Sequence, residues 1–147
     1  MEENTIEIIL VEDNPADVEM TLAALKEHNL SNKVHVLRDG AEALAYIMNN
    51  VDCRPGQVEQ HHPRVILLDL KLPKVDGIDA LRSIRSDERT KSVPVVILTS
   101  SNEEQDRIAS YQLGVNSYIV KPVDFKDFAR AATEIGCYWV LMNKPPY

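Results

Sequence analysis

The chain has 147 residues, of which 44% are hydrophobic and 27% charged, a composition typical of one ordinary globular domain. Its net charge of −7 argues against nucleic-acid binding through bulk charge, and no apolar stretch is long enough to span a bilayer. The acidic start at Met1–Asn4 is unlike a signal peptide, so we expect a cytoplasmic location.

Short apolar runs alternate along the chain with stretches in which apolar residues recur at helical spacing. In chain order they predict a strand at Thr5–Val11, a helix from Pro15 to about His28, a strand at Lys33–Leu37, a helix at Ala41–Asn49, a strand at Val65–Leu68, a helix at about Gly77–Ser86, a strand at Val93–Leu98, a helix to about Leu113, a strand at Ser117–Val120 and a last helix to about Ile135. This alternation predicts an α/β fold of three layers, a doubly wound parallel sheet of five strands with helices on both faces.

Several helix starts carry capping residues. Asn14 before Pro15 is a favourable N-cap, and Asp39 can cap the second helix. Ser101 and Glu104 have the spacing of a capping box for the fourth helix. Asp124 can cap the last one.

The connection at Asn50–Pro63 is longer than most loops in a compact domain and contains Pro55-Gly56. Too little chain precedes it to form a separate core. We therefore interpret it as an insertion at about residues 50–63 in a single domain spanning residues 1–147, with a short extension after about residue 136.

Polar side chains stand just past four of the five predicted strands. They are Glu12 and Asp13 after the first strand, Asp69 after the third, Thr99 after the fourth and Lys121 after the fifth. If the strand order is 2-1-3-4-5, the first and third strands are neighbours, and their acidic residues share one pocket at the carboxyl edge of the sheet.

The chemistry of this set fits phosphoryl transfer. Three carboxylates in one pocket repel each other unless a cation joins them, and oxygen ligands favour a hard ion, Mg²⁺ before Mn²⁺ or Ca²⁺. Asp69 can act as a nucleophile, while Lys121 and Thr99 can contact a phosphoryl group. Singly, each residue also has an ordinary structural explanation as a cap, turn or loop residue, so the interpretation depends on the whole set.

Taken together, these residues resemble the receiver domain of a two-component response regulator. The resemblance covers about Ile6–Ile135. Its matching segments are Val11–Asn14, Leu68-Asp69, Leu72-Pro73 with Asp76-Gly77, Leu98–Ser100, and Tyr118 with Lys121-Pro122. The resemblance implies a flavodoxin-like sheet of order 2-1-3-4-5.

The resemblance also implies a set of roles around the phosphorylation site. Asp69 would accept a phosphoryl group from a phosphohistidine on a sensor histidine kinase. Mg²⁺, or Mn²⁺ in its place, would be held by Asp13, Asp69 and the backbone carbonyl of Lys71, with Glu12 acting directly or through water. Such a protein catalyses its own phosphotransfer and slow dephosphorylation and is not otherwise an enzyme.

Further roles follow for residues of the fourth and fifth strands. Lys121 would contact the phosphoryl group, Thr99 would move toward it, and Tyr118 would turn inward as the aromatic half of a switch. The bond before Pro122 is expected to be cis. From the residue alone, the favoured interpretation of Tyr118 is a packed strand residue that does not move, and the family pattern reverses it.

A narrower resemblance links the chain to stand-alone response regulators that partner bacterial phytochromes. It rests on the Asn50–Pro63 insertion, the run Leu70–Lys74 and the tail Tyr138–Pro146, although Pro122 follows the general receiver pattern, from which some of that subgroup depart. It implies a bacterial phytochrome as a candidate kinase, and a homodimer formed through the fourth and fifth helices. Because about a dozen residues follow the last helix, we expect no DNA-binding module and an effect carried by an interaction surface.

Two alternatives remain open at this stage. The first is a pseudo-receiver, a scaffold that is never phosphorylated. The second is a Mg²⁺-dependent phosphatase of the haloacid dehalogenase type, which needs an acidic residue two positions after its nucleophile. Lys71 occupies that position.

Overall fold

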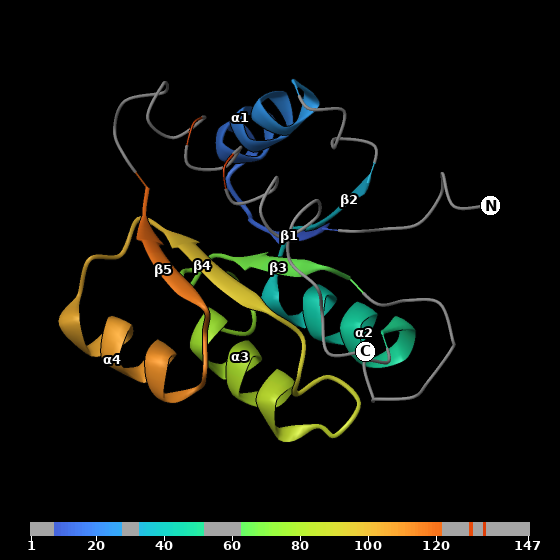
Figure 1. Ribbon diagram of the computed structural model, residues 1–147, viewed down its shortest axis with the longest axis vertical. Helices are drawn as coiled ribbons and strands as arrows, with labels where there is room; N and C mark the ends of the chain where they lie inside the picture. The colour runs from blue at the N-terminus through green and yellow to red at the C-terminus, as the bar shows by residue number, and fades with distance from the viewer. Residues whose placement is uncertain (1–7, 28–32, 52–62, 122–129, 131–133, 135–147) are drawn as a thin grey trace.

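The computed structural model describes residues 8–27, 33–51, 63–121, 130 and 134. In this part of the chain the elements are β1 (Ile8–Val11), α1 (Pro15–Lys26), β2 (Val34–Leu37), α2 (Gly40–Asn50), β3 (Val65–Leu68), α3 (Gly77–Ser86), β4 (Val95–Thr99), α4 (Glu104–Gln112) and β5 (Ser117–Val120). All five strands are parallel and lie in the order β2-β1-β3-β4-β5 (Figure 1). The predicted three-layer fold and strand order are confirmed.

Side chains alternate between the two faces of the sheet, and each face has its own core. Every second residue of a strand, such as Ile9 in β1 and Ile66 in β3, packs with the helices α2 and α3. Their neighbours Leu10 and Leu67 pack with α1 on the opposite face. Figure 1 shows α1 on one side of the sheet and α2, α3 and α4 on the other. Because both faces are covered, the central strands β1 and β3 are apolar throughout rather than alternating.

The register brings the strand ends to one level. Val11 at the end of β1 lies beside both Leu37 and Leu68, and Leu68 lies beside Ile97. The ladder continues one residue further, because the Asp69 backbone N–H donates to the Val11 carbonyl at 3.1 Å. The residues that follow the strands therefore meet at a single edge.

Two of the predicted helix caps are confirmed and one is wrong. The Asn14 side chain accepts hydrogen bonds from two backbone N–H groups of α1, and Asp39 accepts one from Glu42. The predicted capping box at Ser101 does not form, since α4 begins only at Glu104 and Glu103 is its N-cap. The Ser101 hydroxyl is instead committed to Asp106, with a donor–acceptor distance of 2.6 Å.

Other predicted boundaries shift by a few residues or lie outside the described residues. The fourth strand begins at Val95 rather than Val93, and α1 ends at Lys26 rather than near His28. The insertion at 52–62, the peptide bond before Pro122 and the tail after residue 134 are outside the described residues, as is most of the last helix. Its two described residues, Arg130 and Glu134, have helical backbone.

The loop between β3 and α3 packs tightly against its neighbours. A Cβ atom on Gly77 would lie 2.5 Å from the Asp69 carbonyl oxygen, and one on Gly40 would lie 1.8 Å from the Val75 carbonyl oxygen. Only glycine allows backbones to approach this closely. These contacts fix the loop that leaves Asp69, and with it the direction of the site.

Arg85 joins the end of α3 to distant segments. Its guanidinium donates to the carbonyl oxygens of Leu113 and Gly114 at 2.8 and 3.0 Å, and to those of Lys91 and Val93 at 3.1 and 2.7 Å. Five N–H donors in a rigid fork suit such a cluster of acceptors. The side chain therefore anchors the segments that lead into β4 and β5.

Within the described residues, no helix is long and apolar enough to cross a membrane.

Arg85→Ala is expected to lower the free energy of unfolding by about 2–3 kcal/mol, because several carbonyl groups lose a charged donor. The matched control is Arg82→Ala on the same helix, whose exposed partner is Asp79 at 2.9 Å. That change is expected to cost at most about 0.5 kcal/mol. Urea unfolding of both variants checks the prediction, and equal losses would contradict it.

Candidate functional site

Asp69 lies at the carboxyl end of β3, with its side chain only 6% exposed. Its Oδ1 accepts a hydrogen bond from the Thr99 hydroxyl at 2.6 Å and from the Lys71 backbone N–H at 3.2 Å. Its Oδ2 lies 3.2 Å from Nζ of Lys121. Both carboxylate oxygens therefore face donors contributed by other parts of the sheet edge.

Lys121, directly after β5, brings one ammonium group to three carboxylates. Its Nζ contacts Glu12, lies 2.7 Å from Oδ2 of Asp17 and reaches Asp69. The Lys121 backbone N–H donates to the Thr99 carbonyl at 2.7 Å, which continues the β4–β5 ladder and aims the side chain across the edge. The side chain is 8% exposed, so this is a largely buried ion cluster.

Burial and neighbouring charges shift the protonation of this cluster. Desolvation, helped by the charge of Asp69, raises the pKa of Glu12 to about 7, although the hydrogen bond from Lys121 opposes the rise. Burial alone would lower the pKa of Lys121, but its hydrogen bonds to Asp17 and Glu12 and the charge of Asp69 raise it above the ordinary lysine value. Lys121 is thus held as a cation.

Glu12, Asp13 and Asp69 each offer a carboxylate oxygen, and these oxygens lie within 4.8 Å of one another. Asp13 is exposed and the other two are buried, so the cluster opens to solvent at one side. An all-oxygen, anionic donor set without Cys or His is the kind that a hard divalent cation prefers. The acidic cluster fits a divalent metal site.

A hydrogen-bonded chain leads from the site to α4 and β5. The Ser101 backbone N–H donates to the Thr99 hydroxyl oxygen at 3.3 Å, and the Ser101 hydroxyl donates to Asp106. Nζ of Lys71 lies 3.5 Å from the same Asp106 carboxylate. The Tyr118 hydroxyl donates to the Ser101 carbonyl at 3.0 Å. Tyr118 is therefore connected to Asp69 through Ser101 and Thr99.

The structure brings together five of the residues singled out from the sequence: Glu12, Asp13, Asp69, Thr99 and Lys121. Lys71 reaches Asp69 through its N–H group, while its carbonyl as a metal ligand remains a prediction. Sequence reasoning missed the contacts of Asp17 with Lys121 and of Asp106 with Ser101. The only available signal for Asp17 was its position one turn beyond Asp13, near the same strand end.

Comparisons with known proteins agree with this geometry. The family profile of the response regulator receiver domain matches residues 8–133. The probable methanogenesis regulatory protein FilR2 of Methanothrix harundinacea is 39% identical over 95% of this chain and 86% of its own length. Response regulator Rcp1 of a Synechocystis species is 39% identical over 90% of this chain and 88% of its own length.

Solved structures show the same fold over nearly the whole chain. The Mn²⁺-bound form of Rcp1 and the phosphorylated cyanobacterial phytochrome response regulator RcpA each have a TM-score of 0.83 and 36% identity, covering 97% of this chain and 99% of theirs. The bacteriophytochrome response regulator RtBRR has a TM-score of 0.70 and 51% identity, covering 97% of this chain and 84% of its own. With the acidic cluster, the lysine and the threonine at the carboxyl edge of its sheet, this chain belongs to the response regulator receiver family and acts in two-component signalling.

Proposed function

We propose that this receiver takes its phosphoryl group on Asp69, from a phosphohistidine of a sensor histidine kinase. The single observation that carries the proposal is the position of Asp69, whose two oxygens already face the Thr99 hydroxyl and the Lys121 ammonium. Those are the groups that a phosphoryl group attached to this carboxylate would need around its oxygens.

In the proposed transfer, an oxygen of the Asp69 carboxylate attacks phosphorus and forms a new P–O bond. The P–N bond to the kinase histidine breaks, and its electron pair stays on the imidazole nitrogen, which takes a proton from solvent. Lys121 and Thr99 stabilise the negative charge on the phosphoryl oxygens, and the Lys71 N–H holds the carboxylate in place.

The divalent ion at this site is proposed to be Mg²⁺, with Mn²⁺ as a substitute. Glu12, Asp13 and Asp69 would hold it, and the exposed side of Asp13 gives it access from solvent. When bound, Mg²⁺ supplies positive charge to the phosphoryl oxygens and screens the repulsion among the carboxylates. Support from a relative comes from Rcp1, whose structure contains Mn²⁺.

The contacts of Lys71 and Lys121 weigh against the alternative functions. A phosphatase of the haloacid dehalogenase type would need an acid/base carboxylate where Lys71 stands, and Nζ of Lys71 instead pairs with Asp106. A pseudo-receiver has no need of the buried Lys121 ammonium beside Asp69. We therefore propose that the protein is a phosphoacceptor whose own chemistry is limited to phosphotransfer and slow dephosphorylation. The cytoplasmic location expected from the sequence remains a prediction.

A phytochrome kinase is the proposed partner. The names of RcpA and RtBRR connect those proteins with phytochromes, and they match this chain over nearly its full length. Transfer of a phosphoryl group from a purified phytochrome kinase to Asp69 would establish this partner.

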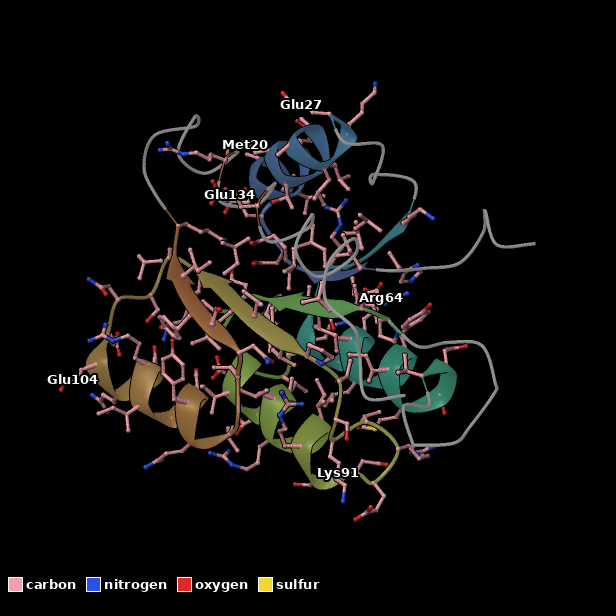
Figure 2. The ribbon with its side chains drawn as sticks, viewed as in Figure 1. Met20, Glu27, Arg64, Lys91, Glu104 and Glu134 are labelled. Carbon is pink, nitrogen blue, oxygen red and sulfur yellow. The ribbon has the colours of Figure 1, made fainter. Side chains whose placement is uncertain are left out.

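We further propose that the chain, as a single receiver domain, signals through a homodimer formed on the α4–β5 face. Ile108 and Tyr111 of α4 are 51% and 54% exposed, and Val120 of β5 is 37% exposed. These three are the large hydrophobic residues exposed among those described, and they belong to two elements that contact each other, α4 and β5 (Figure 1). Figure 2 shows Glu104, at the start of α4, on the opposite side of the sheet from Met20 and Glu27 of α1. The tail residues Tyr138, Trp139 and Met142 are outside the described residues.

Acetyl phosphate with Mg²⁺ is expected to add one phosphoryl group to the wild-type protein, with acetate as the leaving group. Asp69→Asn is expected to abolish the addition, because the amide is not a nucleophile. Asp79→Asn, an exposed carboxylate on α3, is the matched control and retains the modification. Intact-protein mass spectrometry reads the result, and an unmodified wild type would refute the proposed function.

Asp13→Asn is expected to weaken Mn²⁺ binding by about tenfold or more, since removing a ligand costs at least as much as removing a second-shell group. The free Mn²⁺ signal in electron paramagnetic resonance measures the bound fraction directly. Glu19→Gln removes one exposed carboxylate from α1 outside the acidic cluster and serves as the control. Equal affinities for the Asp13 variant and the wild type would place the ion elsewhere.

Tyr111→Glu is expected to shift the sedimentation coefficient from dimer to monomer, because it places a charge in the proposed apolar contact. Glu104→Gln, on the first turn of the same helix, is the comparison variant and keeps the dimer. Both are measured by analytical ultracentrifugation with and without beryllofluoride, a mimic of the phosphoryl group. A Tyr111 variant that stays dimeric would exclude this face.

A further inference from the structure

Among the described carboxylates that contact Lys121, Asp17 is the one that the proposed chemistry does not use. It lies in the first turn of α1, and its Oδ2 is 2.7 Å from Nζ of Lys121. The corresponding distance to Asp69 is 3.2 Å. The lysine is thus held closer to the helix than to the proposed phosphoacceptor.

Each N–H donor of the Lys121 ammonium group already has an acceptor in this arrangement. A lysine ammonium has three N–H donors, and Glu12, Asp17 and Asp69 supply three acceptors. A closer approach to phosphoryl oxygens therefore requires Lys121 to loosen one of its other contacts.

Asp17 is the contact that is given up most easily. Its side chain is 20% exposed, against 4% for Glu12 and 6% for Asp69. Water can replace the lysine at a partly exposed carboxylate, whereas a buried carboxylate left without its partner is costly. The first turn of α1 also stabilises the charge of Asp17 in the absence of Lys121, because the helix dipole favours anions there.

We propose that Asp17 is a positioning residue that holds Lys121 away from Asp69 in the resting protein and so weakens the binding of a phosphoryl group. The inference rests on the proposed function, since it takes Asp69 as the site of the phosphoryl group. Asp17 acts through Lys121 and sets how strongly the resting state competes with the phosphorylated state.

The test compares beryllofluoride affinity in the presence of Mg²⁺, measured by fluorine NMR on the full chain. Asp17→Asn keeps the side-chain shape and removes the charge. It is expected to bind beryllofluoride about two- to fivefold more tightly than the wild type, which corresponds to roughly 0.5–1 kcal/mol for a partly exposed ion pair. Asp17→Glu retains the charge and is expected to stay nearer to the wild type.

Glu19→Gln separates the proposed contact from a general field effect. It removes the same charge from an exposed position two residues further along α1 and is expected to leave the affinity unchanged. If it tightens binding as much as Asp17→Asn does, or if Asp17→Asn binds no more tightly than the wild type, the inference is overturned.

A second measurement, made without metal or beryllofluoride, reports on the lysine itself. In lysine side-chain NMR, the Lys121 ammonium resonance, assigned by its loss in Lys121→Met, is expected to move in Asp17→Asn and to stay in place in Glu19→Gln. An unmoved resonance in Asp17→Asn contradicts the resting contact. A wild type that binds no beryllofluoride would instead refute the proposed function, so the two failures are distinguishable.

Discussion

The ammonium group of Lys121 is the interaction on which the carboxyl edge of the sheet depends. Glu12, Asp17 and Asp69 place three negative charges around it in a largely buried space. Without the cation these carboxylates would repel one another or take up protons, and burial already raises the pKa of Glu12. The structure therefore concentrates negative charge where an anionic phosphoryl group is proposed to arrive, and places the Lys121 ammonium among these charges.

The strand register makes this concentration of charge possible. Val11, Leu68 and Ile97 lie side by side, so β1 and β3 end at one level, and β4 continues two residues further to Thr99 at the same edge. The tight packing of Gly77 against the Asp69 carbonyl directs the chain away at once and leaves the Asp69 side chain at the edge. The three central strands β1, β3 and β4 are buried along their whole length, which holds the residues at their ends in place.

Fixed hydrogen-bonded contacts explain how a change in charge at Asp69 can affect α4 and β5. Thr99 and Ser101 connect the site to Asp106 on α4, and the Tyr118 hydroxyl is bonded to the Ser101 carbonyl. These links involve a helix and a strand that carry exposed hydrophobic residues. A local change in charge thus has a short, hydrogen-bonded route to the proposed interaction face, as expected for a switch that biases a packed element.

The sequence by itself determined the α/β alternation, the positions of the strands and the identity of the residues at their ends, because buried parallel strands are short apolar runs that stop abruptly. Helix starts at Asn14 and Asp39 were also predictable, since capping is a local interaction. The capping box at Ser101 failed because α4 begins only at Glu104, and the Ser101 hydroxyl bonds instead to Asp106 in the first turn of that helix. Only the tertiary structure decided that Asp17 shares Lys121 with Asp69: these residues are far apart along the chain, and the distances among them depend on how α1 and β5 pack at the sheet edge.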